Sequence, residues 1–128
     1  MKKILLVEDN IYLREMYEEA LTVGEFSITL ADDDAQALEK IKQGQFDLIL
    51  IDILLAKLND MEVLKELKKE DSPYKNIPIL LLTNLGDDNL LQEAIDLGAE
   101  GSLSKAHIKP AELVEKITDF FTNKEANQ

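Results

Sequence analysis

Residues 46–52 read Phe-Asp-Leu-Ile-Leu-Ile-Asp, in which four consecutive aliphatic residues precede the final aspartate. Consecutive aliphatic side chains without polar alternation are typical of a strand that is buried on both faces, as strands of parallel sheets are. We therefore predict a strand over Phe46–Ile51, with Asp52 placed directly at its carboxyl end.

Similar apolar runs recur on both sides of this segment. They predict further strands over residues 4–7, 26–30, 79–82 and 102–104. Between them, apolar residues repeat at the spacing of a helix, and five helices are predicted from the following groups: Leu13, Met16, Tyr17, Ala20 and Leu21; Ala37, Leu38 and Ile41; Met61, Leu64 and Leu67; Leu90, Leu91, Ala94 and Ile95; and Leu113, Val114, Ile117, Phe120 and Phe121.

Capping residues bound several of these helices. The Asp32-Asp33-Asp34 run offers N-caps to the second helix, Gly44 and Gly98 are suited to end the second and fourth, and Pro110 suits the first turn of the last. Five strand–helix units result, and such alternation favours an α/β fold with a parallel sheet and helices on both faces. We expect one domain over residues 1–122 and a frayed tail over 123–128.

The composition excludes several classes of function. The chain has 128 residues, 45% hydrophobic and 31% charged, as is usual for a globular domain. Its formal net charge of −12 repels nucleic acid and anionic membranes, so we expect neither as a partner. The absence of cysteine excludes disulfides and thiolate catalysis. Because no apolar run is long enough for a signal peptide or a membrane span, we expect a cytoplasmic protein.

Polar residues mark the predicted strand ends, where sites lie in folds of this kind. They are Glu8, Asp9, Asp52, Thr83 and Lys105. Three carboxylates at one edge repel one another unless a cation neutralises them, and oxygen-only ligands favour Mg²⁺. Because Mg²⁺ commonly binds phosphate oxygens as well, the pattern indicates phosphoryl transfer, for which Asp52, Lys105 and Thr83 offer a nucleophile, a cation and a hydroxyl.

In this order, the motifs closely resemble the receiver domain of two-component response regulators over nearly the whole chain. The acidic pair follows Lys3-Ile4-Leu5-Leu6-Val7, and residues 47–52 are similar to the strand that carries the phosphoacceptor. The resemblance implies a flavodoxin-like three-layer α/β/α sandwich of (βα)5 type with the strand order 2-1-3-4-5.

The resemblance also assigns a Mg²⁺ site. Asp52 is then the phosphoacceptor and one of the metal ligands. Asp9 is a direct ligand, Glu8 acts through water, and the backbone carbonyl of Leu54 supplies a further oxygen.

For the phosphoryl group, the resemblance implies that Thr83 donates a hydrogen bond and Lys105 forms an ion pair. The chain departs from the usual family pattern at other positions. Ser102 stands where an aromatic residue usually moves inward on phosphorylation, Ala106 replaces a proline after the lysine, and residues 55–60 lack the usual turn sequence. We expect these departures to affect the step from phosphorylation to output.

We expect a stand-alone receiver that accepts a phosphoryl group from a sensor histidine kinase or a histidine phosphotransfer protein. Its fourth helix, fifth strand and fifth helix then form the surface that controls an effector protein, or a surface for dimerisation of an otherwise monomeric chain. We expect no separate turnover activity. The alternative is a receiver-like interaction module that signals without phosphorylation, as Ser102, Ala106 and the altered turn at Ala56-Lys57 suggest.

An enzyme of similar architecture is a third class. An aspartyl phosphatase needs Asp-x-Asp after the first strand, whereas the chain has Glu8-Asp9-Asn10. It also lacks the glycine-rich loops of dinucleotide-binding proteins and nucleotide hydrolases. Flavin binding stays open by analogy of fold alone.

Overall fold

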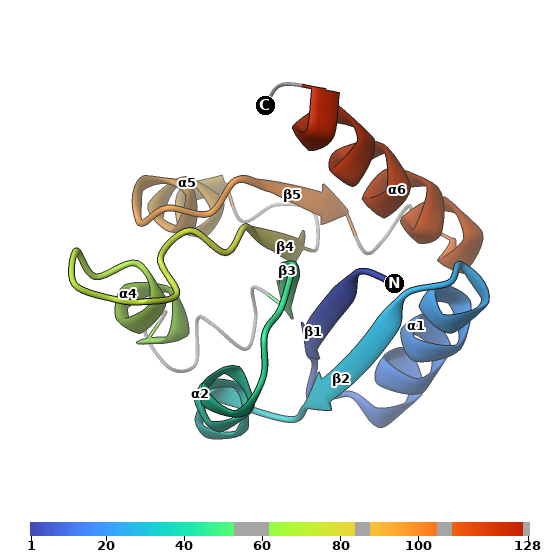
Figure 1. Ribbon diagram of the computed structural model, residues 1–128, viewed down its shortest axis with the longest axis horizontal. Coiled ribbons are helices and arrows are strands. Elements are labelled where there is room, and N and C mark those ends of the chain that lie inside the picture. Colours follow the sequence, from blue (N-terminus) through green and yellow to red (C-terminus); the bar gives the residue numbers. More distant parts are fainter. Residues whose placement is uncertain (53–61, 84–87, 105–108, 127–128) are drawn as a thin grey trace.

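A computed structural model describes residues 1–52, 62–83, 88–104 and 109–126 of the chain. Its centre is a five-stranded sheet in the order β2-β1-β3-β4-β5, with every neighbouring pair parallel (Figure 1). This order confirms the fold inferred from the sequence. The strands are Lys3–Val7 (β1), Ser27–Ala31 (β2), Leu48–Asp52 (β3), Ile79–Thr83 (β4) and Gly101–Ser104 (β5).

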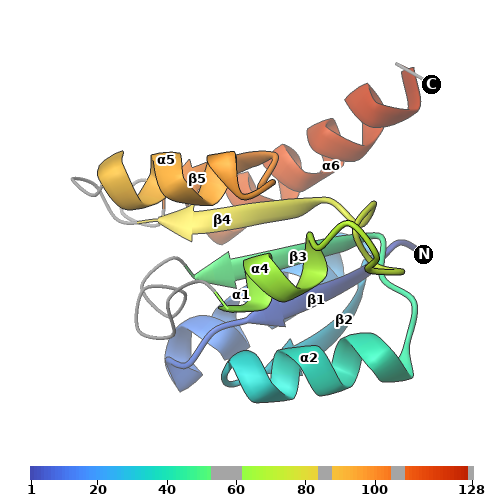
Figure 2. The same ribbon diagram turned by 90° about the vertical axis from the view of Figure 1, so that its left-hand side faces the viewer.

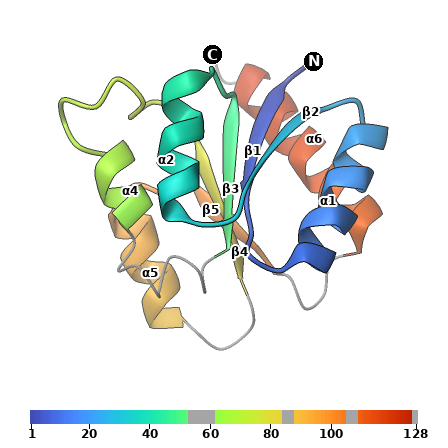
Figure 3. The same cartoon turned by 90° about the horizontal axis from the view of Figure 1, so that it is seen from below.

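Helices cover both faces of the sheet. Figure 2 shows α2, α4 and α5 in front of the strands, and Figure 3 shows α1 and α6 on the opposite side. The helices, labelled as in Figure 1, are Ile11–Val23 (α1), Asp34–Gln43 (α2), Glu62–Leu67 (α4), Asp88–Asp96 (α5) and Pro110–Ala126 (α6). Among the described residues, none of the helices has the length and apolar character needed to cross a membrane.

The aliphatic strands are explained by two cores, one on each face. In β3, Ile49 and Ile51 join the core under α2, α4 and α5, whereas Leu48 and Leu50 join the core under α1 and α6. All four side chains are fully buried. Because alternate residues of a strand point to opposite faces, a sheet covered on both sides needs apolar residues at every position.

Several helix ends follow the predicted local signals. The Asp33 side chain accepts a hydrogen bond from the Gln36 N–H at 2.8 Å, which makes Asp33 the N-cap of α2. Gly98 follows α5 and has a φ of +120°, a backbone conformation that would be strained in a residue with a side chain. Helix α6 begins at Pro110 as expected, but it includes residues 123–126, which the sequence suggested would fray.

Candidate metal and phosphoryl site

Two neighbouring strands end together at the carboxyl edge of the sheet. In β1 and β3, Val7 pairs with Ile51 in a parallel register. The next residues along the two strands are Glu8 and Asp52, so parallel pairing places their side chains at the same edge. The pattern of strand ends therefore predicted this meeting correctly.

Glu8, Asp9 and Asp52 form an acidic cluster. One carboxylate oxygen from each residue lies within 4.8 Å of the others. Glu8 is fully buried and Asp52 is 3% exposed, whereas Asp9 is exposed to solvent. Carboxylates held this close, two of them away from water, repel one another strongly unless a cation is shared between them.

The geometry of the cluster fits a hard divalent cation. Oxygens on opposite sides of one Mg²⁺ lie about 4.2 Å apart, because each Mg–O bond is about 2.1 Å long. Carboxylates within 4.8 Å of each other can therefore share one ion directly or through a water molecule. The oxygen-only donor set and the exposed side at Asp9 also suit a metal that keeps several waters.

The turn that carries the acidic pair is held by neighbouring elements. The Glu8 N–H donates to the Ala31 carbonyl at 3.0 Å, at the end of β2. Asn10 is the N-cap of α1, and its Oδ1 accepts hydrogen bonds from the N–H groups of Tyr12 at 3.0 Å and Leu13 at 3.1 Å. The acidic pair thus precedes a capped helix N-terminus, where the helix dipole favours negative charge.

Thr83 is the last residue of β4, the strand that pairs with β3. Asp52 pairs with Leu82 in the register of β3 and β4, so the backbone of Thr83 lies one residue beyond the level of Asp52. Its backbone therefore lies at the predicted edge, and its role toward a phosphoryl group stays a prediction. Lys105 and Leu54, the other two predicted site residues, lie outside the described residues.

Ser102 lies in β5, where it pairs with Leu81 and is exposed. The position at which the family usually carries an aromatic switch residue is therefore on an edge strand with its side chain open to solvent. Whether this change alters the output stays a prediction. Ala106 and the turn over residues 55–60 lie outside the described residues.

Sequence reasoning missed one contact at this edge. The Arg14 Nη1 atom donates to the Glu8 carbonyl at 3.2 Å and forms an ion pair with Asp32. From the sequence, Asp32 was expected only to cap a helix with its neighbours; that expectation was incomplete, because Asp33 is the N-cap and Asp32 pairs with Arg14. One signal was available: of the 14 Lys and Arg residues, only this one is an arginine.

Comparison with known proteins agrees with the fold. Residues 4–118 match the response regulator receiver domain family. The chain is 30% identical over 122 residues to the chemotaxis protein CheY of Halobacterium salinarum, covering 94% of this chain and 98% of that protein. It is 34% identical over 117 residues to a transcriptional regulatory protein CpxR homolog of Haemophilus influenzae, covering 91% of this chain but only 49% of that protein.

Solved structures show the same likeness. The structure of the chemotaxis protein CheY4 of Vibrio cholerae has a TM-score of 0.82 and 31% sequence identity, with coverage of 93% of this chain and 98% of that one. With most of its length matched and the acidic cluster at the expected strand ends, the chain belongs to the response regulator receiver domain family of two-component signal transduction.

Proposed function

We propose that this protein accepts a phosphoryl group on Asp52 in the presence of Mg²⁺ and uses the product as a signalling state. The observation that carries the proposal is the position of Asp52, 3% exposed at the end of a central strand and clustered with Glu8 and Asp9. A cation bound there supplies the neutralisation that an anionic phosphoryl group needs to approach a carboxylate.

In the proposed transfer, a carboxylate oxygen of Asp52 attacks the phosphorus of a phosphohistidine. The P–O bond forms as the P–N bond breaks, the imidazole leaves with the electron pair of that bond, and the product is an acyl phosphate. Two further groups complete the proposed site: Thr83, which ends the neighbouring strand, and Lys105, which follows β5 in the sequence. A hydroxyl and an ammonium group are suited to contact the phosphoryl oxygens.

Receiver domains interact with histidine kinases and effector proteins. We infer that the donor here is a sensor histidine kinase or a histidine phosphotransfer protein in the cytoplasm, and that α5, β5 and α6 form the output surface. The protein then assists its own phosphorylation and dephosphorylation and has no separate turnover activity. The ion pair with Lys105 and the hydrogen bond from Thr83 then bias the conformation of that surface.

One observation favours an alternative function. Ser102, at the usual position of the switch aromatic, is small and exposed. A receiver-like module that binds its partner without phosphorylation needs no aromatic residue there. Under this alternative, the output surface has the same conformation whether or not Asp52 carries a phosphoryl group.

Amide NMR spectra recorded in the presence of Mg²⁺, before and after the addition of acetyl phosphate, distinguish the two functions. We expect shifts at residues around the acidic cluster and also along α5, β5 and α6. The Asp52→Asn variant, treated in the same way, is the control and should show neither set. Shifts restricted to the surroundings of Asp52 would support the phosphorylation-independent module.

A further inference from the structure

Arg14 connects the acidic turn to a second turn of the same sheet edge. Its side chain is 15% exposed and extends from the first turns of α1. As described above, Nη1 contacts both the Glu8 carbonyl and the Asp32 carboxylate. A side chain in a helix points toward the N-terminus of that helix, so Arg14 is well placed to reach back to the residues that precede α1.

Asp32 is itself fixed by the start of α2. Its N–H donates to Gln36 Oε1 at 3.0 Å, and the Gln36 Nε2 donates to Asp32 Oδ2 at 3.4 Å. These reciprocal contacts belong to the same capping arrangement in which Asp33 binds the Gln36 N–H. Asp32, the ion-pair partner of Arg14, is therefore held in position by α2, whereas Arg14 belongs to α1.

The contact from Arg14 acts on the peptide group that joins Glu8 to Asp9, two residues of the proposed metal site. The Glu8 N–H is bound to Ala31 at 3.0 Å, and the Glu8 carbonyl is bound to Arg14 at 3.2 Å. Because a peptide group is planar, the contact to the Glu8 carbonyl also fixes the plane that contains the Asp9 nitrogen. Asp9 is exposed, so the orientation of its backbone, rather than packing, sets where its carboxylate lies.

We propose that Arg14 is a positioning residue for the cation site: by bridging Asp32 and the Glu8 carbonyl, it holds Asp9 in the orientation that binds Mg²⁺. This inference rests on the proposed function, since it presupposes a Mg²⁺ site at Glu8, Asp9 and Asp52. It goes beyond that function because it assigns the affinity of the site partly to a contact between the turns that follow β1 and β2.

A positioning role and a purely electrostatic role predict opposite signs. A fixed positive charge near the cluster repels Mg²⁺, so if charge alone matters, the Arg14→Gln variant binds Mg²⁺ more tightly. If position matters, the same variant binds Mg²⁺ more weakly. We expect a loss of about tenfold, the lower end of what is usual for residues that orient metal ligands.

The test is a calorimetric Mg²⁺ titration of the unphosphorylated protein, with the melting temperature of each variant measured alongside. Arg14→Gln and Asp32→Asn should each weaken binding, and the double variant should bind no more weakly than Arg14→Gln alone, because both act through one contact. Arg14→Lys should recover part of the affinity. Lys42→Gln, which removes a positive charge from the exposed end of α2, is the matched control and should bind as the unmodified protein does.

Tighter or unchanged Mg²⁺ binding by Arg14→Gln overturns the positioning role while leaving the proposed function intact. Additive losses in the double variant overturn the link through Asp32. An unmodified protein that binds no Mg²⁺ overturns both this inference and the metal site on which it rests. Asp32 is 53% exposed, so its variant reports on the contact even if Arg14→Gln fails to fold.

Discussion

Asp9 is the exposed carboxylate of the acidic cluster, and it is the group of the three that solvent and an incoming cation meet first. Replacing it by asparagine keeps the shape of the side chain and removes its charge. We predict that Asp9→Asn weakens Mg²⁺ binding by about tenfold or more, since hard cations depend on anionic oxygens. Calorimetric titration measures this directly.

Stability provides the second readout of the same substitution. Removing one of three neighbouring negative charges relieves repulsion, so Asp9→Asn should unfold at the same temperature as the unmodified protein or at a higher one.

The control for the Mg²⁺ titration is Asp71→Asn. Asp71 is an exposed aspartate in the turn after α4, and its replacement should leave the Mg²⁺ affinity unchanged. Equal Mg²⁺ affinity for Asp9→Asn and the unmodified protein would show that Asp9 is not a ligand.

At the scale of single residues, the sequence was informative wherever position along the chain determines position in space. Glu8, Asp9 and Asp52 were predicted to meet because each directly follows or ends a buried parallel strand. The bridge from Arg14 to Asp32 could not be predicted in this way. It depends on how closely α1 approaches the turn after β2, which no local pattern specifies.

The start of α1 links an element to the site. Asn10 caps this helix by accepting hydrogen bonds from two backbone N–H groups directly after the acidic pair. We predict that Asn10→Ala lowers the free energy of unfolding by about 1 kcal/mol, because those donors lose their partner. Urea denaturation measures the change.

A second exposed asparagine provides the control for the Asn10→Ala variant. Asn123 lies within α6, so Asn123→Ala should be neutral or slightly stabilising, given the higher helix propensity of alanine. If Asn10→Ala and Asn123→Ala have the same stability, the cap contributes nothing measurable.

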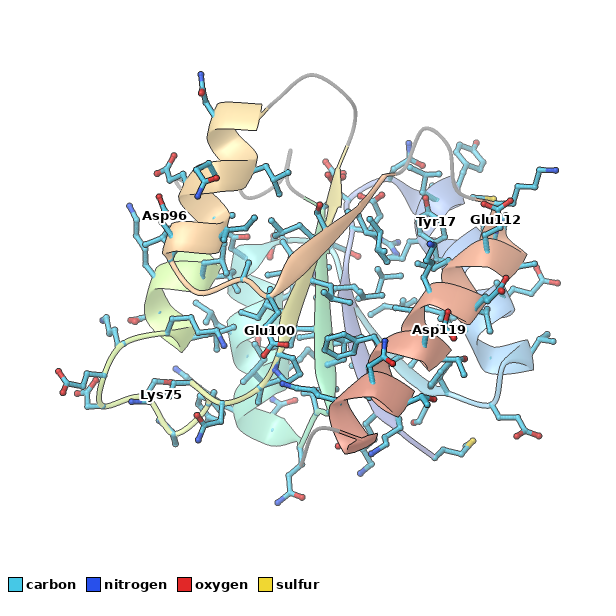
Figure 4. All side chains as sticks on the ribbon, turned by 90° about the horizontal axis from the view of Figure 1, so that it is seen from above. Tyr17, Lys75, Asp96, Glu100, Glu112 and Asp119 are labelled. Atoms are coloured by element: carbon cyan, nitrogen blue, oxygen red, sulfur yellow. The ribbon has the colours of Figure 1, made fainter. Side chains whose placement is uncertain are left out.

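Lys68 joins α4 to the turn before β4. Its Nζ donates to the carbonyls of Lys75 at 2.8 Å and Ile77 at 2.9 Å, and its side-chain carbons lie against Gly98. Figure 4 shows Lys75 in that turn and Glu100 just before β5. Burial lowers the pKa of Lys68 below its usual 10.5, while Glu100 raises this pKa and Lys124 lowers it.

The lowered pKa predicts a pH dependence of stability. Between the folded pKa and 10.5, the unfolded chain binds more protons at Lys68 than the folded protein does. The contribution of Lys68 to stability therefore rises as the pH increases toward 10.5. We expect the stability of the unmodified protein relative to Lys68→Met to be greater at about pH 10 than at about pH 7.

Urea denaturation of both proteins at the two pH values measures this difference. Lys65→Met, on the exposed side of α4, is the matched control for the loss of one positive charge. A stability difference between the unmodified protein and Lys68→Met that shrinks with rising pH would contradict the assigned direction of the pKa shift.

At the scale of elements, the prediction succeeded where the signals were local. Asp33 and Pro110 mark the beginnings of α2 and α6 because capping and proline act on their own helix. The length of α6 was underestimated, since its last turn carries few apolar residues. That turn is supported by a contact distant in sequence, the ion pair of Lys124 with Glu100 at 2.9 Å.

Across the whole molecule, the two hydrophobic cores explain why the fold could be predicted from the sequence. A sheet covered by helices on both faces requires aliphatic strands, and amphipathic helices must alternate with them. The chain spans about half of the CpxR homolog of Haemophilus influenzae but nearly all of the Halobacterium CheY. The partner and the donor depend on surface residues, which the pattern of buried positions does not specify.

Charge is the property of the whole molecule that bears most on the central claim. The chain has a formal net charge of −12. A phosphoryl group brings about two negative charges while the Asp52 carboxylate loses its own, so phosphorylation adds about one net negative charge beside carboxylates that already repel one another. We therefore predict that phosphorylation of Asp52 requires Mg²⁺ and is strongly slowed when a chelator removes it.

Intact-mass spectrometry after treatment with acetyl phosphate tests this claim most directly. The unmodified protein with Mg²⁺ should gain the mass of one phosphoryl group and lose it again in neutral hydroxylamine, which cleaves acyl phosphates. Protein treated with chelator, and the Asp52→Asn variant with Mg²⁺, should gain little or nothing. The same mass gain in Asp52→Asn, or a phosphoryl group that resists hydroxylamine, would contradict the assignment of Asp52 as the acceptor.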